Sequence, residues 1–136
     1  EKRVNMRYVL DTNTLIYFFK GLGDVSKHML AQSPSELSIP AVVLFELEVG
    51  IAKSTSPNKR KSQLQEITAL VNILPFGIAE SRSAAQIRVE LEKQGLPIGP
   101  YDVLIAATAL ANNTILITHN QKEFGRIEGL KIEDWF

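Results

Sequence analysis

Two short segments of this chain pass from apolar to polar residues, "VLDTN" near the start and "ILITHN" near the end. Asp11 directly follows the apolar residues of the first segment, and Asn120 is the last residue of the second. Functional groups of open parallel sheets gather just beyond the carboxyl ends of the strands, so both side chains are expected at one reactive edge. A structural role is the alternative, because Asp11, Thr12 and Asn13 are all good N-cap residues for a following helix.

Further acidic candidates lie within apolar helices. The segment "AVVLFELEVG" contains Glu46 and Glu48, and because acids are rarely buried without a partner, at least one is expected to face a polar cleft. Periodicity alone does not choose between them. The segment "GPYDVLIAATAL" places Asp102 in the first turn of a helix, where an acid also favours the helix dipole. The rest of that helix is almost wholly apolar, so its burial would hold Asp102 fixed at the sheet edge.

Three carboxylates from distant segments repel one another unless a cation lies among them. Oxygen ligands suit Mg²⁺ or Mn²⁺ better than zinc. The chain has no cysteine, which excludes disulfides, thiolate zinc sites and thiol nucleophiles and is typical of cytoplasmic proteins. The two histidines, His28 and His119, are isolated in the sequence and are expected to be exposed or structural.

Short β-rich segments alternate with helical patterns along the chain. We expect strands at residues 7–10, 37–39, 72–75 and 114–118, with a last short strand within 129–136. We expect helices at residues 14–20, 24–32, 40–53, 79–94 and 101–112. Residues 53–62 are expected to form an exposed polar connection, which a further helix follows to about residue 71. This alternation predicts an α/β fold with a parallel sheet covered on both faces.

The composition bounds the functions that this chain can have. Its 136 residues suit one domain, expected from Met6 onward, with Glu1 to Asn5 as a tag or an upstream extension. Fifteen basic and fifteen acidic residues cancel, so no overall field attracts nucleic acid or a membrane. No apolar run approaches the roughly 20 residues that span a bilayer. A polyanion must therefore bind through a local basic patch or through metal ions.

Four segments, in order, resemble the motifs of PIN-domain ribonucleases: "LDTNTLIYF", "FELEVG", "GPYDVLIAATAL" and "ILITHNQKEFGRIEGLKIEDW". More narrowly, they resemble the VapC-type toxins of bacterial toxin–antitoxin pairs. The resemblance covers the chain from Met6 onward and implies a three-layer α/β/α fold around a central, mainly parallel sheet.

The resemblance also implies the site. It makes Asp11, Glu46 and Asp102 the acidic metal ligands, and it takes Glu46 rather than Glu48. Many PIN domains have a fourth acid where this chain has Asn120, which is assigned to the catalytic group although its amide supplies no charge.

Two further residues are candidates to hold a carboxylate or a water, namely Asn13 and Thr118, with ordinary turn and strand-end roles as the alternative. The implied chemistry is hydrolysis of RNA phosphodiester bonds assisted by Mg²⁺ or Mn²⁺, with 3′-hydroxyl and 5′-phosphate products. No protein nucleophile is required. A structured RNA such as a tRNA is the implied substrate.

RNA contact requires basic side chains near the acids, because the acids repel phosphate. The candidates are Lys53, Lys59, Arg60, Lys61, Arg82, Arg88, Lys122 and Arg126. The alternative is that each of them lies on an ordinary solvated face. If these side chains contact phosphate, RNA affinity should fall steeply with salt.

The resemblance further implies a small cognate antitoxin that blocks the acidic site, and a homodimer. Leu15, Tyr17, Phe18 and Phe19 are candidates for either interface, with core packing as the default interpretation.

Two rival functions remain. A phosphatase of the haloacid-dehalogenase type also begins with a strand that ends in Asp, but Asn13 stands where its second acid would be. The other rival is a non-catalytic RNA- or protein-binding module with a weakened PIN site, and Asn120 is the feature that favours it.

Overall fold

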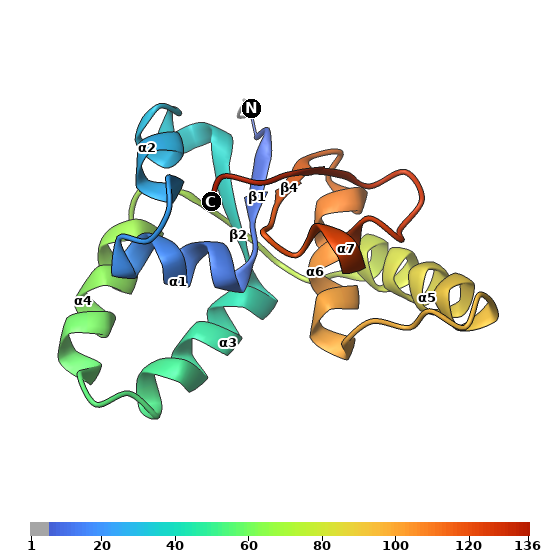
Figure 1. The fold of residues 1–136 in the computed structure, drawn as a ribbon, viewed down its shortest axis with the longest axis horizontal. Coiled ribbons are helices and arrows are strands. Elements are labelled where there is room, and N and C mark those ends of the chain that lie inside the picture. The colour runs from blue at the N-terminus through green and yellow to red at the C-terminus, as the bar shows by residue number, and fades with distance from the viewer. Residues whose placement is uncertain (1–5) are drawn as a thin grey trace.

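Five parallel strands form the centre of the protein in a computed structural model that describes residues 6–136 (Figure 1). The strands are β1 (Tyr8–Leu10), β2 (Leu37–Pro40), β3 (Asn72–Leu74), β4 (Ile115–Ile117) and β5 (Lys131–Glu133). They lie in the order β3-β2-β1-β4-β5, and every pairing is parallel. The α/β fold that the sequence predicts is confirmed.

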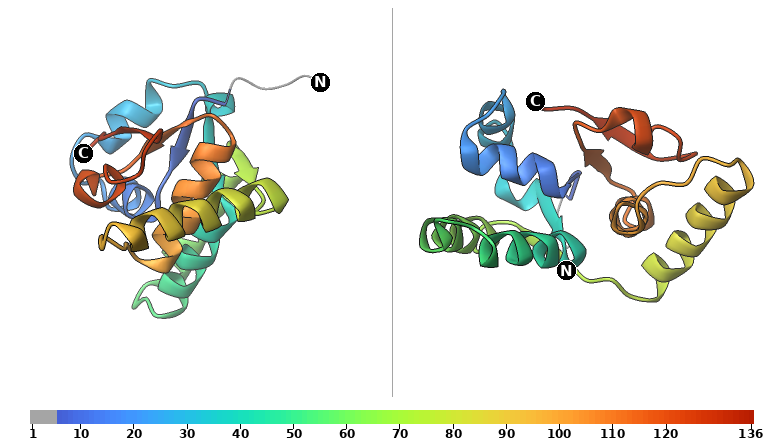
Figure 2. Two further views of the ribbon diagram at one scale, coloured as in Figure 1. Left: turned by 90° about the vertical axis from the view of Figure 1, so that its right-hand side faces the viewer. Right: turned by 60° about the horizontal axis from the view of Figure 1, so that its bottom comes forward.

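Helices flank the sheet on both sides. They are α1 (Thr12–Lys20), α2 (Val25–Leu30), α3 (Ala41–Ala52), α4 (Pro57–Thr68), α5 (Ile78–Lys93), α6 (Pro100–Ala111) and α7 (Gln121–Phe124), with a 3-10 turn at Pro34–Glu36. Helices α1 to α4 lie on one side, and α5 and α6 lie on the other (Figure 1 and Figure 2). The three layers that the family resemblance implies are therefore present.

The central strands are apolar on both faces, as expected of parallel strands that helices cover on both sides. Val9 and Leu10 of β1 and Leu116 and Ile117 of β4 have no exposed surface. The edge strands β3 and β5 are partly exposed. The core is thus centred on β1, and its carboxyl end leads directly to Asp11.

The pairing of β1 with β4 places two strand ends side by side. Leu10 pairs with Ile117, and the backbone N–H of Asp11 donates a 3.2 Å hydrogen bond to the carbonyl oxygen of Ile117. Asp11 and Thr118 therefore follow adjacent strand ends, as the sequence predicts for a parallel sheet.

Helix α1 begins two residues earlier than its apolar pattern predicts. Asp11 is the N-cap, and its Oδ1 accepts a hydrogen bond of 2.8 Å from the backbone N–H of Thr14. This cap extends the helix to include Thr12 and Asn13. The helix ends at Gly21, whose φ of 68° is left-handed and suits a residue without a side chain.

Most other predicted elements are present within a few residues of the predicted ends. The prediction of an exposed connection at 53–62 is wrong in part, because the following helix begins inside it at Pro57, which suits the first turn of a helix, and ends at Thr68 rather than 71. Helix α7 and the 3-10 turn were not predicted, because so few residues show no helical period. The predicted tag or extension at residues 1–5 lies outside the described residues. Between residues 6 and 136, no helix combines the length and the apolar character needed to cross a membrane.

The apolar side chains of α1 serve the core. Leu15 has no exposed surface, and Tyr17, Phe18 and Phe19 are partly buried against the core. Core packing, the default interpretation of these residues, accounts for their positions.

Candidate active site

Asp11 is a buried carboxylate at the carboxyl end of β1. Only 5% of its surface is exposed. Burial raises the pKa of Asp11 above its ordinary value, hydrogen bonds with the side chains of Thr118 and Thr14 and with the Thr14 backbone oppose that rise, and the charge of Glu46 adds to it. Asp11 therefore caps α1 and also lies close to a second acid, so the structural and chemical roles coexist in one side chain.

Glu46 is the second acid, and it projects from α3. Glu46 is half-buried, whereas Glu48 is exposed. The Oε1 atom of Glu46 accepts a hydrogen bond of 2.6 Å from Oγ1 of Thr12. The charge of Glu46 raises the pKa of both Asp11 and Asp102. Of the two glutamates that the helical period leaves open, Glu46 is the one that lies among the other acids.

Asp102 is the third acid, in the first turn of α6. Burial, followed in order of size by the charges of Glu123, Glu46 and Asp11, raises its pKa from the ordinary value of 3.8 to about 6. Every cause that acts on this pKa raises it. Asp102 therefore lies among negative charges that no nearby cation offsets within residues 6–136.

Glu123 is a fourth acid that the sequence interpretation missed. It lies on α7, is half-buried, and is the largest single charge acting on the pKa of Asp102. The spacing Asn-x-x-Glu from Asn120 to Glu123 was the available signal, but it is also the spacing of a structural capping box. Here the Asn120 backbone N–H donates to Oγ1 of Thr118 at 3.0 Å instead, so Glu123 is not needed as a cap.

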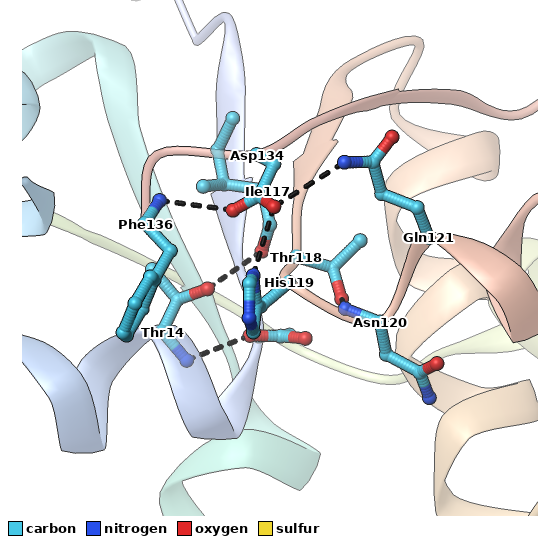
Figure 3. Close-up of polar contacts among 9 residues, drawn as sticks. Thr14, Ile117, Thr118, His119, Asn120, Gln121, Asp134 and Phe136 are labelled. Atoms are coloured by element: carbon cyan, nitrogen blue, oxygen red, sulfur yellow. Dashed lines mark hydrogen bonds and ion pairs between the residues drawn. The ribbon is translucent and has the colours of Figure 1, made fainter. Parts of the chain in front are cut away.

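The residues expected to support the acids divide into two groups. Thr118 is fully buried and forms a side-chain hydrogen bond with Asp11. Its Oγ1 also accepts a hydrogen bond from the backbone N–H of Asn120. Figure 3 shows Thr118 and Asn120 on the segment that follows β4, near Thr14. Asn13, in contrast, is exposed, and the neighbouring Thr12 makes the contact with a carboxylate that was expected of Asn13.

The acids fit a divalent cation by their chemistry, although they do not yet close around one. Within residues 6–136, no three acidic or histidine side chains converge tightly enough to enclose a metal ion as they stand. The charges of the other three acids nevertheless raise the pKa of Asp102, so the four carboxylates are close enough to repel one another. Carboxylate oxygens are the ligands that Mg²⁺ and Mn²⁺ prefer. Ligation therefore requires some of these side chains to move toward the ion, and the ion would cancel their repulsion.

Several basic candidates already have partners. Arg60 donates to the carbonyl oxygen of Phe19 at 3.3 Å, Arg126 donates to that of Pro97 at 3.3 Å, and Arg88 forms an exposed ion pair of 2.9 Å with Glu92. The remaining candidates are exposed: Lys53, Lys59, Lys61, Arg82 and Lys122.

One basic candidate is next to an acid in the sequence, and another lines a pocket together with an acid. Lys122 directly precedes Glu123 on α7. Arg60 and Glu46 line the same pocket, of about 400 Å³, between α1, α3 and α4.

Two exposed aromatic rings flank the acids. Phe45 precedes Glu46 on α3, and Tyr101 precedes Asp102 on α6. Their ring centroids are 5.6 Å apart in an edge-to-face arrangement, and about half of each residue is exposed. The contact joins the two helices that carry these acids.

Both histidines have structural partners. Nδ1 of His119 lies 2.8 Å from Oδ2 of Asp134, and its ring stacks on Phe136 with centroids 4.4 Å apart (Figure 3). His28 stacks on Trp135 at 5.6 Å. These contacts give both histidines structural partners, which is the role that the sequence interpretation expects of them.

Known proteins match nearly the whole chain. The model of the PIN domain family matches residues 8–130. The tRNA(fMet)-specific endonuclease VapC of Salmonella typhimurium is 32% identical over 130 residues, and Ribonuclease VapC2 of Rickettsia felis is 36% identical over 133 residues. Each alignment covers 96% of this chain and 98% of the relative.

A solved structure extends this likeness to three dimensions. The crystal structure of DNA-bound VapBC from Salmonella typhimurium aligns with a TM-score of 0.90 at 32% identity, over 96% of this chain and 99% of that one. The chain therefore belongs to the PIN-domain family and, within it, to the VapC-type ribonuclease toxins of toxin–antitoxin pairs.

Proposed function

We propose that this protein is a Mg²⁺- or Mn²⁺-dependent endoribonuclease that cleaves a structured RNA, with tRNA as the substrate class. One observation carries the proposal: carboxylates from the end of β1, from α3, from α6 and from α7 gather at one sheet edge with no compensating cation in residues 6–136. The activity named for the Salmonella relative, on tRNA(fMet), supports the choice of tRNA.

The acids have separate duties in this proposal. Asp11, Glu46 and Asp102 would hold the metal ion, which when bound supplies activation of water and of the scissile phosphate. Thr118 and the α1 cap hold Asp11 in place. Asn120 would orient the water or the neighbouring acid through its amide, because it has no charge to contribute.

The RNA strand needs contacts beyond the acids, which repel its phosphates. Lys122 supplies a positive charge beside Glu123, and Phe45 and Tyr101 offer exposed ring surface beside Glu46 and Asp102. Unpaired bases stack on such rings regardless of charge. RNA would then be held by stacking and by phosphate contacts on either side of the acids. The other basic candidates remain expected contacts of lower priority.

A cognate antitoxin is the proposed protein partner. The Salmonella structure contains VapC together with VapB, and this chain shares its fold across 96% of its length. An antitoxin segment in the pocket that Glu46 and Arg60 line would block the acids. We also expect a homodimer, one domain from Met6 onward, and action in the cytoplasm, where tRNA is found.

The test is cleavage of total bacterial RNA by the purified, antitoxin-free protein, followed by sequencing of the new ends. Samples contain Mg²⁺ or Mn²⁺, and parallel samples contain EDTA or the Asp11→Asn variant. Discrete cuts with 5′-phosphate ends, absent in both controls, are expected. The Asn variant retains an Oδ1 that can accept from the Thr14 N–H, so its fold should survive.

Two outcomes contradict the proposal. Equal cleavage by the parent and by Asp11→Asn means that the acids are not catalytic. A folded parent that cuts no RNA with either ion favours the non-catalytic binding module. Cleavage by Asn120→Asp would then show that the missing charge at this position is the cause.

A further inference from the structure

The first turn of α1 contacts two acids of the site. Asp11 is the N-cap of this helix, and Thr12 is its first residue. Oγ1 of Thr12 donates a hydrogen bond of 2.6 Å to Oε1 of Glu46, 34 residues further along the chain. In the part of the chain that the structure describes, this is the hydrogen bond that the Glu46 carboxylate makes.

The place of Thr12 in its helix leaves its hydroxyl free for this contact. Threonines inside helices commonly donate to the carbonyl oxygen four residues earlier. Thr68 does so to Leu64 at 2.9 Å, and Thr108 does so to Leu104 at 2.8 Å. Thr12 has no preceding helical turn, so its single hydroxyl proton is directed across to α3 instead.

The consequence is a fixed carboxylate. A glutamate side chain has three rotatable bonds, and Glu46 is only half-buried on α3, so packing alone leaves it free to rotate. The Thr12 hydrogen bond holds Oε1 and leaves Oε2 available for a cation. Neighbours that orient a metal ligand typically change metal affinity by roughly 10- to 100-fold when they are removed.

We propose that Thr12 is a positioning residue that holds Glu46 ready for the divalent cation. The proposal rests on the metal site proposed above. It assigns to Thr12 the supporting role that the sequence pattern suggested for Asn13, whose side chain is exposed.

The test is the dissociation constant of Mn²⁺, measured by titration calorimetry without RNA. Thr12→Val keeps the branched shape and removes the donor, whereas Thr12→Ser keeps the donor. Thr68→Val is the matched control, because it also removes a partly buried hydrogen bond that a threonine hydroxyl donates, here to the carbonyl oxygen of Leu64 on α4. We expect roughly 10-fold weaker Mn²⁺ binding for Thr12→Val and nearly parental binding for Thr12→Ser and Thr68→Val.

A double-mutant cycle shows whether Thr12 acts through Glu46. Thr12→Val should cause little further loss in a Glu46→Gln background, since the carboxylate that it positions is already gone. Full additive loss in that background, or a parental constant for Thr12→Val alone, overturns the role of Thr12 while the metal site stands. A folded parent that binds no Mn²⁺ overturns the metal site and this role together.

Discussion

Nδ2 of Asn120 donates a hydrogen bond of 3.1 Å to Oε1 of Glu123, so the amide at the position of a fourth acid is joined to an acid three residues further along. Glu123 is the largest charge acting on Asp102. The negative charge that Asn120 lacks therefore reaches the site from α7. This arrangement weakens the case for a non-catalytic binding module with a weakened PIN site, because that case rested on Asn120 alone.

Glu123→Gln should lower RNA cleavage by about 10-fold or more, because it removes one of four charges that attract the cation. The same change should lower the pKa of Asp102 toward its ordinary value, since a negative neighbour is lost. Cleavage rates at saturating and limiting Mn²⁺ measure the first effect. The pKa of the Asp102 carboxyl, measured by NMR, checks the second. Glu128→Gln, an exposed acid just after α7, is the control. Equal losses in the two variants contradict a specific role for Glu123.

The sequence allowed the sheet and three of the acids to be predicted because both depend on local pattern. Apolar segments that end in polar residues marked β1 and β4, and the parallel sheet then placed Asp11 and Asn120 at one edge. Helical period could not separate Glu46 from Glu48, because both have apolar neighbours. The resemblance to PIN-domain ribonucleases chooses Glu46, and the packing of α3 against α1 and α6 places Glu46 among the other acids.

The residues that were missed depend on contacts between distant segments. The bond from Thr12 to Glu46 spans 34 residues, and no local pattern encodes it. Glu123 lies on a helix of four residues, too short to show a period. Such contacts are set by tertiary packing, which a single sequence does not reveal.

The metal-free protein should lose stability as pH rises through about 6. Burial and neighbouring charges raise the folded-state pKa of Asp102 from 3.8 to about 6, so between these values the folded state binds more protons than the unfolded state. The free energy of unfolding therefore falls as pH increases across this range. The pKa of Asp11 is raised as well and contributes with the same sign.

Melting temperatures in EDTA at pH 5 and pH 8 check this expectation. Asp102→Asn cannot ionise, so its melting temperature should change less between the two pH values than that of the parent. Glu48→Gln, which changes an exposed acid on α3, should follow the parent. A parental pH dependence in Asp102→Asn would show that other groups control it.

Lys122→Ala should weaken RNA binding across sequences and reduce the slope of log affinity against log salt by about 1, as expected for the loss of one phosphate contact. Binding is measured with the Asp11→Asn variant, which is expected not to cut the RNA. Lys93→Ala is the comparison, because Lys93 is an exposed basic residue at the end of α5 that is not among the candidate RNA contacts. Indistinguishable salt slopes for all three proteins contradict a phosphate contact at Lys122.

Phe45→Ala and Tyr101→Ala should each weaken RNA binding, since loss of a base–aromatic stack costs about 1–3 kcal/mol, or roughly 5- to 150-fold in affinity. The measurement is binding of an RNA with a fluorescent base analogue beside the cut site, whose emission is quenched by stacking. Unlike Lys122→Ala, these variants should leave the salt slope unchanged, because rings neutralise no phosphate.

Val89→Ala is the control for the ring variants, because Val89 is a half-exposed apolar residue on α5. Size-exclusion chromatography separates the remaining alternative, in which the exposed rings pack against another copy of the chain. Parental RNA binding with loss of the dimer assigns Phe45 and Tyr101 to a protein interface and contradicts stacking. Weaker binding with unchanged oligomeric state and restored emission of the base analogue places an RNA base on the rings, next to the acids that cut the strand.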